Sequence, residues 1–265
     1  MARIIAITNQ KGGVGKTTTC VNLAAALAAN RKRVLLIDLD PQGNATVGVG
    51  LDRREVMPTA YEVLIDQRRL DEAVHEVTQA GFDVLPANGD LTAAEVALLE
   101  AGRREQRLRN QLREAADRYD YVLIDCPPSL NILTLNALVA AHGVLIPIQC
   151  EYFALEGLTA LLDTVRGVQA SANPGLVIDG LLRTMFDARN NLANQVGEQL
   201  AAHFKNQIYH TVIPRNVRLA EAPSHGLPAL AYDRASRGAL AYMALADEME
   251  RRHRSDDAAS AASSA

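Results

Sequence analysis

A glycine-rich segment near the start of the chain has the residue types of a phosphate-binding loop. It reads Lys11-Gly12-Gly13-Val14-Gly15-Lys16-Thr17-Thr18. Glycines let the backbone turn so that its N–H groups point at a phosphate, and a following helix adds its partial positive charge. The lysine after the last glycine can reach the β- and γ-phosphates, and the next hydroxyl can bind Mg²⁺. The loop therefore predicts a site for ATP and Mg²⁺, with Lys16 on the phosphates and Thr17 on the metal.

Aspartates end two apolar segments that follow the loop along the chain. Asp38 and Asp40 come after the apolar run 34–37, and Asp125 comes after the run 122–124. An acid at the carboxyl end of a central parallel strand lies at the mouth of the phosphate crevice. Because hard oxygen ligands suit Mg²⁺, we expect Asp125 to hold the metal through water. For Asp38 and Asp40 the pattern leaves three roles open: contact with the metal, contact with a water molecule, or a structural role as strand-end caps.

Short apolar runs alternate with helical patterns along the chain, which is typical of βαβ units on a parallel sheet. The predicted strands are 3–8, 33–37, 82–86, 121–124, 143–148, 177–184 and 208–213. The predicted longer helices are 17–29, 103–116, 132–140, 155–170, 192–204 and 235–252. The strands are almost continuously apolar, as strands covered on both faces should be. We therefore expect a single-domain α/β P-loop fold with a mostly parallel central sheet and helices on both faces.

Two regions are less regular. The segment 43–79 has patterns for short helices at 59–65 and 70–77. The tail 255–265 is made of small and polar residues without an apolar face, so we predict that it is disordered. The domain prediction is accordingly one ATPase domain over 1–254 and a disordered polar tail over 255–265.

Composition excludes several classes of protein. Of 265 residues, 48% are hydrophobic and 22% are charged, which is ordinary for a packed domain. The three cysteines are widely spaced, which favours reduced thiols in the cytoplasm. No apolar run is long enough for a secretory signal or for a membrane span. The net charge of −4 means that any contact with DNA must come from a local basic patch.

The loop departs from the usual pattern in an informative way. Gln10 stands where the first glycine is expected, and Lys11 follows it. The segment thereby resembles the deviant phosphate loop of the ParA/MinD superfamily residue for residue. In that family the lysine at Lys11 reaches across a dimer interface to the partner's nucleotide, so the resemblance implies a catalytic role in trans. It also implies that Asp40 orients the attacking water and that Asp38 assists near the metal.

Further motifs narrow the resemblance to the chromosomal, Soj-type ParA partition ATPases. They are Ile7-Thr8-Asn9-Gln10, Asp38-Leu39-Asp40-Pro41-Gln42-Gly43-Asn44, Asp125-Cys126-Pro127-Pro128-Ser129, Gln149-Cys150-Glu151-Tyr152, Ala154-Leu155-Glu156-Gly157, Ile213-Pro214-Arg215-Asn216-Val217-Arg218 and Glu221-Ala222-Pro223-Ser224-His225-Gly226. The resemblance implies that Pro214 and Asn216 hold the adenine. Arg189 and Arg215 match family positions that contact DNA, and Arg218 lies in the same basic segment.

As an expectation, the family implies an ATP-dependent homodimer that binds double-stranded DNA without sequence preference. Hydrolysis, stimulated by a ParB-type centromere-binding protein, would release it during chromosome segregation. We therefore expect a weak intrinsic ATPase that is cytoplasmic and nucleoid-associated, without a membrane partner. Because the chain begins directly with a strand, we do not expect operator-specific repression.

Other members of the superfamily supply the competing hypotheses. A membrane-cycling ATPase of the MinD type would need an amphipathic C-terminal helix, and the tail 255–265 lacks that pattern. Regulation of replication initiation stays open as an alternative. A protein like the nitrogenase iron protein would need paired cysteines for a bridging iron–sulfur cluster, and a scaffold ATPase would need a C-x-x-C pair. Neither pattern is present in the sequence.

Overall fold

Eight strands form one sheet in the computed structural model, which describes residues 2–65, 67–100, 102–152 and 154–263. Their order across the sheet is β3-β4-β2-β5-β1-β6-β7-β8. The strands are β1 Arg3–Ile7, β2 Val34–Asp38, β3 His75–Val77, β4 Phe82–Leu85, β5 Tyr121–Asp125, β6 Gly143–Gln149, β7 Val177–Phe186 and β8 Ile208–Pro214. All neighbours pair in parallel except β3 with β4.

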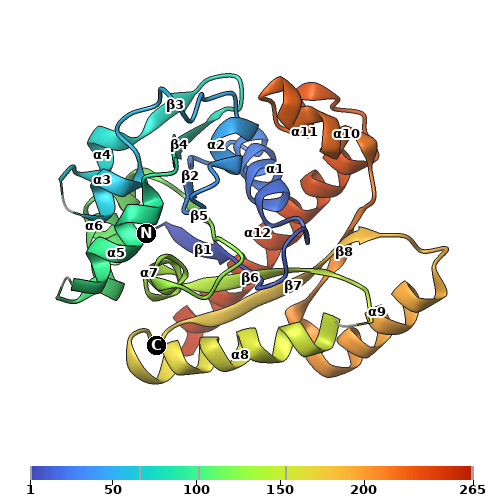
Figure 1. The fold of residues 1–265 in the computed structure, drawn as a ribbon. Helices are drawn as coiled ribbons and strands as arrows, with labels where there is room; N and C mark the ends of the chain where they lie inside the picture. Colours follow the sequence, from blue (N-terminus) through green and yellow to red (C-terminus); the bar gives the residue numbers. More distant parts are fainter. Residues whose placement is uncertain (1, 66, 101, 153, 264–265) are drawn as a thin grey trace.

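Helices cover both faces of this sheet (Figure 1). They are α1 Lys16–Ala29, α2 Asn44–Gly48, α3 Ala60–Leu64, α4 Leu70–Ala73, α5 Leu91–Glu100, α6 Arg107–Ala115, α7 Ile132–Ala140, α8 Ala154–Ser171, α9 Asn191–Phe204, α10 Val217–Glu221, α11 Ala229–Tyr232 and α12 Arg237–Ser263. Apolar residues of α1, α2, α10, α11 and α12 pack on one face, and those of α3 to α9 pack on the other. The predicted α/β class, with a mostly parallel sheet between two helical layers, is confirmed.

Successive strand residues feed the two cores alternately. On β1, Ile4 and Ala6 join the core under α3 to α9, while Ile5 and Ile7 join the core under α1 and α12. This follows from the two-residue period of a strand, and it explains why the central strands read as unbroken apolar runs.

The structure differs from the expected helix at 70–77. The helix α4 ends at Ala73, and residues 75–77 form β3, which pairs antiparallel with β4 at the edge of the sheet. Val77 is buried whereas Glu76 is exposed, so this short segment alternates as a half-covered strand does. The helix α5 was not predicted.

The tail is the second difference. We predicted disorder from residue 255, whereas in the structure α12 continues through Ser263. Alanine is the best helix former, and Arg3 forms ion pairs with Asp256 and Asp257 of this extension. Residues 264–265 lie outside the described residues, and the domain boundary at 254 stays a prediction. No helix of the described residues is long and apolar enough to cross a membrane.

The sheet brings the candidate residues to one edge. In register, Ile7 at the end of β1 pairs with Asp125 at the end of β5, and Asp38 at the end of β2 pairs with the same Asp125. The glycine-rich loop leaves β1 at this edge, as the Figure 1 ribbon shows for the connection from β1 to α1. The loop and the two aspartates therefore meet at the carboxyl ends of adjacent central strands.

Candidate nucleotide site

The glycine-rich loop turns from β1 into α1 through left-handed backbone. Gly13 has φ 73° and Gly15 has φ 87°, a region that favours glycine. Lys16 begins α1 and is only 7% exposed, and its Nζ donates to the carbonyl oxygen of Lys11 at 3.1 Å. Burial lowers the pKa of Lys16, and the nearby charge of Asp125 opposes that shift. The loop thus curls around a buried lysine at a helix N-terminus, which is the arrangement that binds phosphate.

Two hydrogen-bonded side chains hold the loop against β6 and β7. Thr184 of β7 donates its hydroxyl hydrogen to the carbonyl of Val14 at 2.8 Å. Asn9 donates to the carbonyl of Pro147 on β6 at 2.8 Å and accepts from the Lys11 N–H at 3.0 Å. Sequence reasoning missed both roles. A polar residue near the carboxyl end of an apolar strand, as Thr184 is, was the available signal.

Asp125 is a buried acid without a hydrogen-bond partner. Both of its carboxylate oxygens are buried and accept no hydrogen bond from the part of the chain that the structure describes. Burial and then the neighbouring Asp38 raise its pKa well above the usual range. The Thr17 side chain lies close by and lowers this pKa, although its geometry does not make it a hydrogen-bond donor to Asp125. Burying a carboxylate without hydrogen-bond partners lowers the stability of the fold, and a bound cation would offset that loss.

The residues around Asp125 fit Mg²⁺. Thr17 lies on the first turn of α1, where its hydroxyl can join the carboxylate as a hard oxygen ligand. The described residues include no group of three or more acidic, histidine or cysteine side chains that could hold a metal by themselves. Proteins usually bind Mg²⁺ through one or two carboxylates together with substrate phosphates, and Asp125 at the end of β5, beside the phosphate loop, can serve as such a carboxylate.

Asp38 differs from Asp125 although the two are neighbours in the sheet. Its Oδ1 accepts from the Asp40 N–H at 3.1 Å, and its Oδ2 accepts from the N–H and the hydroxyl of Thr46 at 2.9 and 2.8 Å. Burial raises its pKa to about 6, and the hydrogen bonds from Thr46 limit the rise. Protein donors therefore already satisfy this carboxylate.

Asp40 and Lys11 lie beside the phosphate loop in different ways. Asp40 is 8% exposed, and its Oδ1 accepts from the Gln42 N–H at 3.0 Å, which leaves Oδ2 without a protein donor among the described residues. The Lys11 side chain is 42% exposed, and its Nζ pairs with Glu151 at 2.5 Å. Asp40 is thus turned into the protein, whereas Lys11 lies at its surface.

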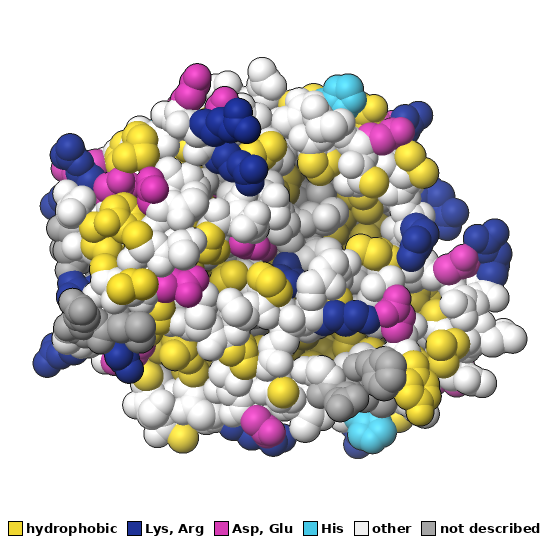
Figure 2. Space-filling view, viewed as in Figure 1, with side chains coloured by type: hydrophobic (Ala, Val, Ile, Leu, Met, Phe, Trp, Pro, Cys, Tyr) yellow, Lys and Arg dark blue, Asp and Glu magenta, His cyan; other side chains and the backbone are white. Residues whose placement is uncertain are grey.

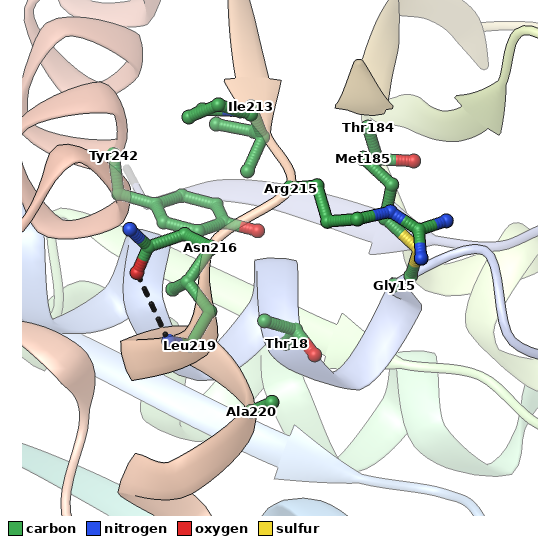
Figure 3. A pocket seen from close by; sticks show the side chains of 11 residues that line it. Gly15, Thr18, Thr184, Met185, Ile213, Arg215, Asn216, Leu219, Ala220 and Tyr242 are labelled. Carbon is green, nitrogen blue, oxygen red and sulfur yellow. Dashed lines mark hydrogen bonds between the residues drawn. The ribbon is translucent and has the colours of Figure 1, made fainter. Parts of the chain in front are cut away.

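A cavity of about 230 Å³ adjoins the loop on the side of β7 and β8 (Figure 3). It is lined by Gly15, Thr18, Thr184, Met185, Ile213, Pro214, Arg215, Asn216, Leu219, Ala220 and Tyr242. Pro214 and Asn216, predicted to hold the adenine, thus share one cavity with Gly15. The Asn216 Oδ1 accepts from the Leu219 N–H at 3.3 Å and caps α10. A cavity with several apolar walls next to a phosphate loop suits a flat base.

The three predicted DNA contacts lie near one another but differ in their partners. Figure 2 shows Lys and Arg side chains on the right of this face, over the region of α10 and the turn from β7 to α9 in Figure 1. Arg189 is 90% exposed and binds Asp187 through two nitrogens at 2.8 and 2.9 Å. Arg218 pairs with Glu221 and Asp233. Arg215 extends across the cavity toward Met185 and Gly15 (Figure 3).

Comparison with known proteins places this chain in a family. A family model described as an AAA domain matches residues 2–178. The sporulation initiation inhibitor protein Soj of Bacillus subtilis is 54% identical over 94% of this chain and 98% of its own length. The chromosome partitioning protein ParA of Myxococcus xanthus is 52% identical over 95% of this chain and 89% of its own length.

Two solved structures are similar to this chain. Cobyrinic acid a,c-diamide synthase from Mycobacterium smegmatis, with a bound ATP analogue and magnesium, is 38% identical with a TM-score of 0.85, covering 97% of each chain. A plasmid partition protein from Borrelia burgdorferi is 28% identical with a TM-score of 0.70, covering 83% of this chain and 94% of its own. The resemblance carried by the sequence motifs is confirmed, and the chain belongs to the Soj/ParA family of chromosome-partitioning P-loop ATPases.

Proposed function

We propose that this chain is an ATP-operated switch for DNA partition in chromosome segregation. As a member of its family it is an ATP hydrolase with ATP and Mg²⁺ as cofactors. In the proposed cycle, the ATP-bound form is a dimer that sandwiches the nucleotides and binds DNA without sequence preference. A ParB-type centromere-binding partner stimulates hydrolysis, and the dimer then separates and leaves the DNA. The protein would accordingly work in the cytoplasm, on the nucleoid.

The residues of the site divide the work of hydrolysis. The loop N–H groups, the start of α1 and Lys16 bind the phosphates, and the buried position of Lys16 strengthens its attraction to them. Thr17 and Asp125 would hold Mg²⁺, which neutralises charge on the phosphate oxygens when it is bound. Asp40, with one carboxylate oxygen without a protein donor among the described residues, would orient the attacking water.

The position of Lys11 carries the proposal of a dimer. Its backbone carbonyl accepts from Lys16, but its side chain lies at the surface and pairs with Glu151. An exposed ion pair contributes about 0–1 kcal/mol, so the lysine can leave Glu151 at little cost. A second copy bound against this face would receive the Lys11 cation at its own phosphates, where it would stabilise developing negative charge.

The arginines near the nucleotide cavity support DNA binding. Arg189 and Arg218 pair with carboxylates at the surface, and such pairs can exchange a carboxylate for a phosphate without a large loss. Phosphate contacts add affinity without reading bases, and a dimer doubles their number. Arg215 lines the cavity, so this cation would lie next to a nucleotide bound there.

Sedimentation and DNA binding of the purified protein test the proposal. With ATP and Mg²⁺ the wild type should sediment as a dimer and bind duplexes of unrelated sequence with similar affinity. Lys16→Ala, which loses the phosphate contact, should do neither. The proposal fails if the wild type with ATP stays monomeric and does not bind duplex, or if Lys16→Ala matches it. A candidate ParB-type protein should raise the ATPase rate in the presence of DNA.

A further inference from the structure

A single buried threonine ties down the turn that carries Asp40. Thr46 lies on α2 and has no exposed surface. It donates its N–H and its hydroxyl hydrogen to Oδ2 of Asp38, and its hydroxyl oxygen accepts from the Ala87 N–H at 2.8 Å. Thr46 therefore connects the end of β2 to the segment that follows β4. Every polar group of its side chain is used.

Asp38 connects Thr46 to the backbone of Asp40. Its Oδ1 accepts from the Asp40 N–H, and the Asp40 carbonyl accepts in turn from the Gly43 N–H at 2.8 Å. The backbone on both sides of the Asp40 side chain is thereby fixed. The bonds run in one order, from Ala87 through Thr46 and Asp38 to the backbone of Asp40.

The turn also has little room to relax. Gly43 has φ 62°, and a Cβ at this position would lie 2.7 Å from the Ala87 carbonyl oxygen. The backbone at Gly43 thus packs directly on the same residue that donates to Thr46. Two contacts with Ala87 hold the turn in a single arrangement.

From this geometry we propose that Thr46 and Asp38 are positioning residues that aim the Asp40 carboxylate, and that Asp38 is not a ligand of Mg²⁺. The proposal rests on the proposed role of Asp40 in orienting water. The proposal distinguishes two acids, Asp38 and Asp125, that both stand at the end of an apolar strand. Asp38 has protein donors on both oxygens, whereas Asp125 has none among the described residues. Asp38 already accepts three hydrogen bonds, whereas both oxygens of Asp125, which accept none within the described ranges, are free for the metal's oxygen-rich shell.

The Thr46 hydroxyl can be removed with little change of shape. Thr46→Val should lower kcat by about tenfold or more, because a small misplacement of a reacting group costs that much, while the KM for ATP stays within about twofold. Thr46→Ser keeps the hydroxyl and should restore most of kcat. A purely structural role would instead lower the fraction of active protein equally in both variants. A folded Thr46→Val with wild-type kcat would overturn the proposal.

A second arm measures metal dependence without turnover. The affinity for a fluorescent, non-hydrolysable ATP analogue is titrated against Mg²⁺ for Asp38→Asn and Asp125→Asn. Asp38→Asn should leave the Mg²⁺ midpoint within about twofold, and Asp125→Asn should raise it by about tenfold or more, since it loses the ligand charge. Equal shifts in both variants would overturn the assignment of Asp38. This arm decides even if Thr46→Val fails to fold.

Hydrogen exchange separates this proposal from the proposed function. Thr46→Val should speed amide exchange in the peptide 39–48, because the Asp40 N–H loses its oriented acceptor. Unchanged exchange there would contradict the restraint, whatever the ATPase does. If the wild type does not hydrolyse ATP but exchange responds as expected, the proposed function fails and the restraint stands.

Discussion

Two buried aspartates at opposite ends of the strands differ in their hydrogen-bond partners, and the difference distinguishes a structural carboxylate from a ligand-binding one. Asp179, near the start of β7, accepts from the Tyr209 hydroxyl at 2.6 Å and binds Nε2 of His253 at 2.6 Å. Burial alone would raise the pKa of Asp179, but His253 and Tyr209 hold it below its usual value. Asp125, at the end of β5, has no such donors among the described residues, and its pKa is raised.

The difference separates stability from ligand binding. Asp179 joins α12 to β7 and β8 through satisfied hydrogen bonds, and Tyr121 stacks on the same His253. Asp125 leaves its lone pairs open in a buried place, which costs stability until a cation arrives. One end of the sheet is therefore built to hold the fold together, and the other is built to bind.

The largest effect should come from the lysine at the binding end. Lys16→Ala should lower ATP turnover by about 10²- to 10³-fold, because it removes a buried cation from the phosphates. Lys32→Ala is the matched control, since Lys32 lies beyond the far end of α1, where its partly exposed side chain pairs with the buried Glu250. Steady-state ATPase assays measure both. Similar rates for the two variants would contradict the site.

A substitution at the other end of the sheet should lower stability and leave the ATP site intact. Asp179→Asn should lower the free energy of unfolding by about 3 kcal/mol, because it breaks a buried charged network. ATP binding should stay unchanged. Since the pKa of Asp179 is depressed, its contribution is present above its unfolded value of about 4 and is lost as the pH falls through the lower folded value. Urea unfolding at several pH values checks this, and a variant as stable as wild type at neutral pH would refute it.

Asp125→Asn should reveal the cost of the unsatisfied carboxylate. Without ligands the variant should be about 1–2 kcal/mol more stable than wild type near neutral pH, because a neutral amide is cheaper to bury than a charge. A raised pKa means that the wild type loses stability as the pH rises from the unfolded toward the folded value, and the variant should lack this slope. Thermal melts with and without Mg-ATP test it. A variant destabilised without ligand would show that Asp125 is structural, like Asp179.

The smallest effect concerns the exposed arginines. Arg189→Ala should weaken DNA binding by the ATP-bound form a few-fold and reduce the dependence on salt by about one released counterion per lost contact. Arg166→Ala on α8 is a matched control, because Arg166 also pairs with a nearby exposed aspartate. Fluorescence anisotropy at several salt concentrations measures both. Equal losses for the two variants would contradict a DNA contact at the turn between β7 and α9.

Much of this contrast could be predicted from the sequence, since it depends on local patterns. Apolar runs placed seven strands, and the rule that strand-end acids gather at one edge brought Asp38 and Asp125 beside the loop. The resemblance placed Pro214 and Asn216, which do line the cavity next to Gly15. The short edge strand β3 and the helix in 255–263 were not predicted, because an edge pairing and a contact with Arg3 depend on distant parts of the chain.

The difference between the two acids was beyond the sequence for the same reason. Asp38 and Asp125 both end apolar strands, and the hydrogen bonds that Asp38 accepts from Thr46 and from the Asp40 N–H distinguish them. The bond from Thr184 to Val14 likewise joins residues 170 positions apart. Such contacts exist only after the sheet has formed, whereas the glycine-rich loop is a continuous segment.

Mixing two inactive variants tests most directly whether the binding end is completed by a second copy. Lys11→Ala lacks the cation for its partner, and Asp40→Ala lacks the water-orienting acid of its own site. Each should hydrolyse ATP at least about 10²-fold more slowly than wild type. In a mixed dimer, the Lys11→Ala subunit keeps Asp40 and receives Lys11 from the other subunit, so the mixture should regain about a quarter of wild-type activity if subunits pair at random. A mixture that forms dimers with ATP but stays as inactive as its components would contradict a lysine acting across the interface.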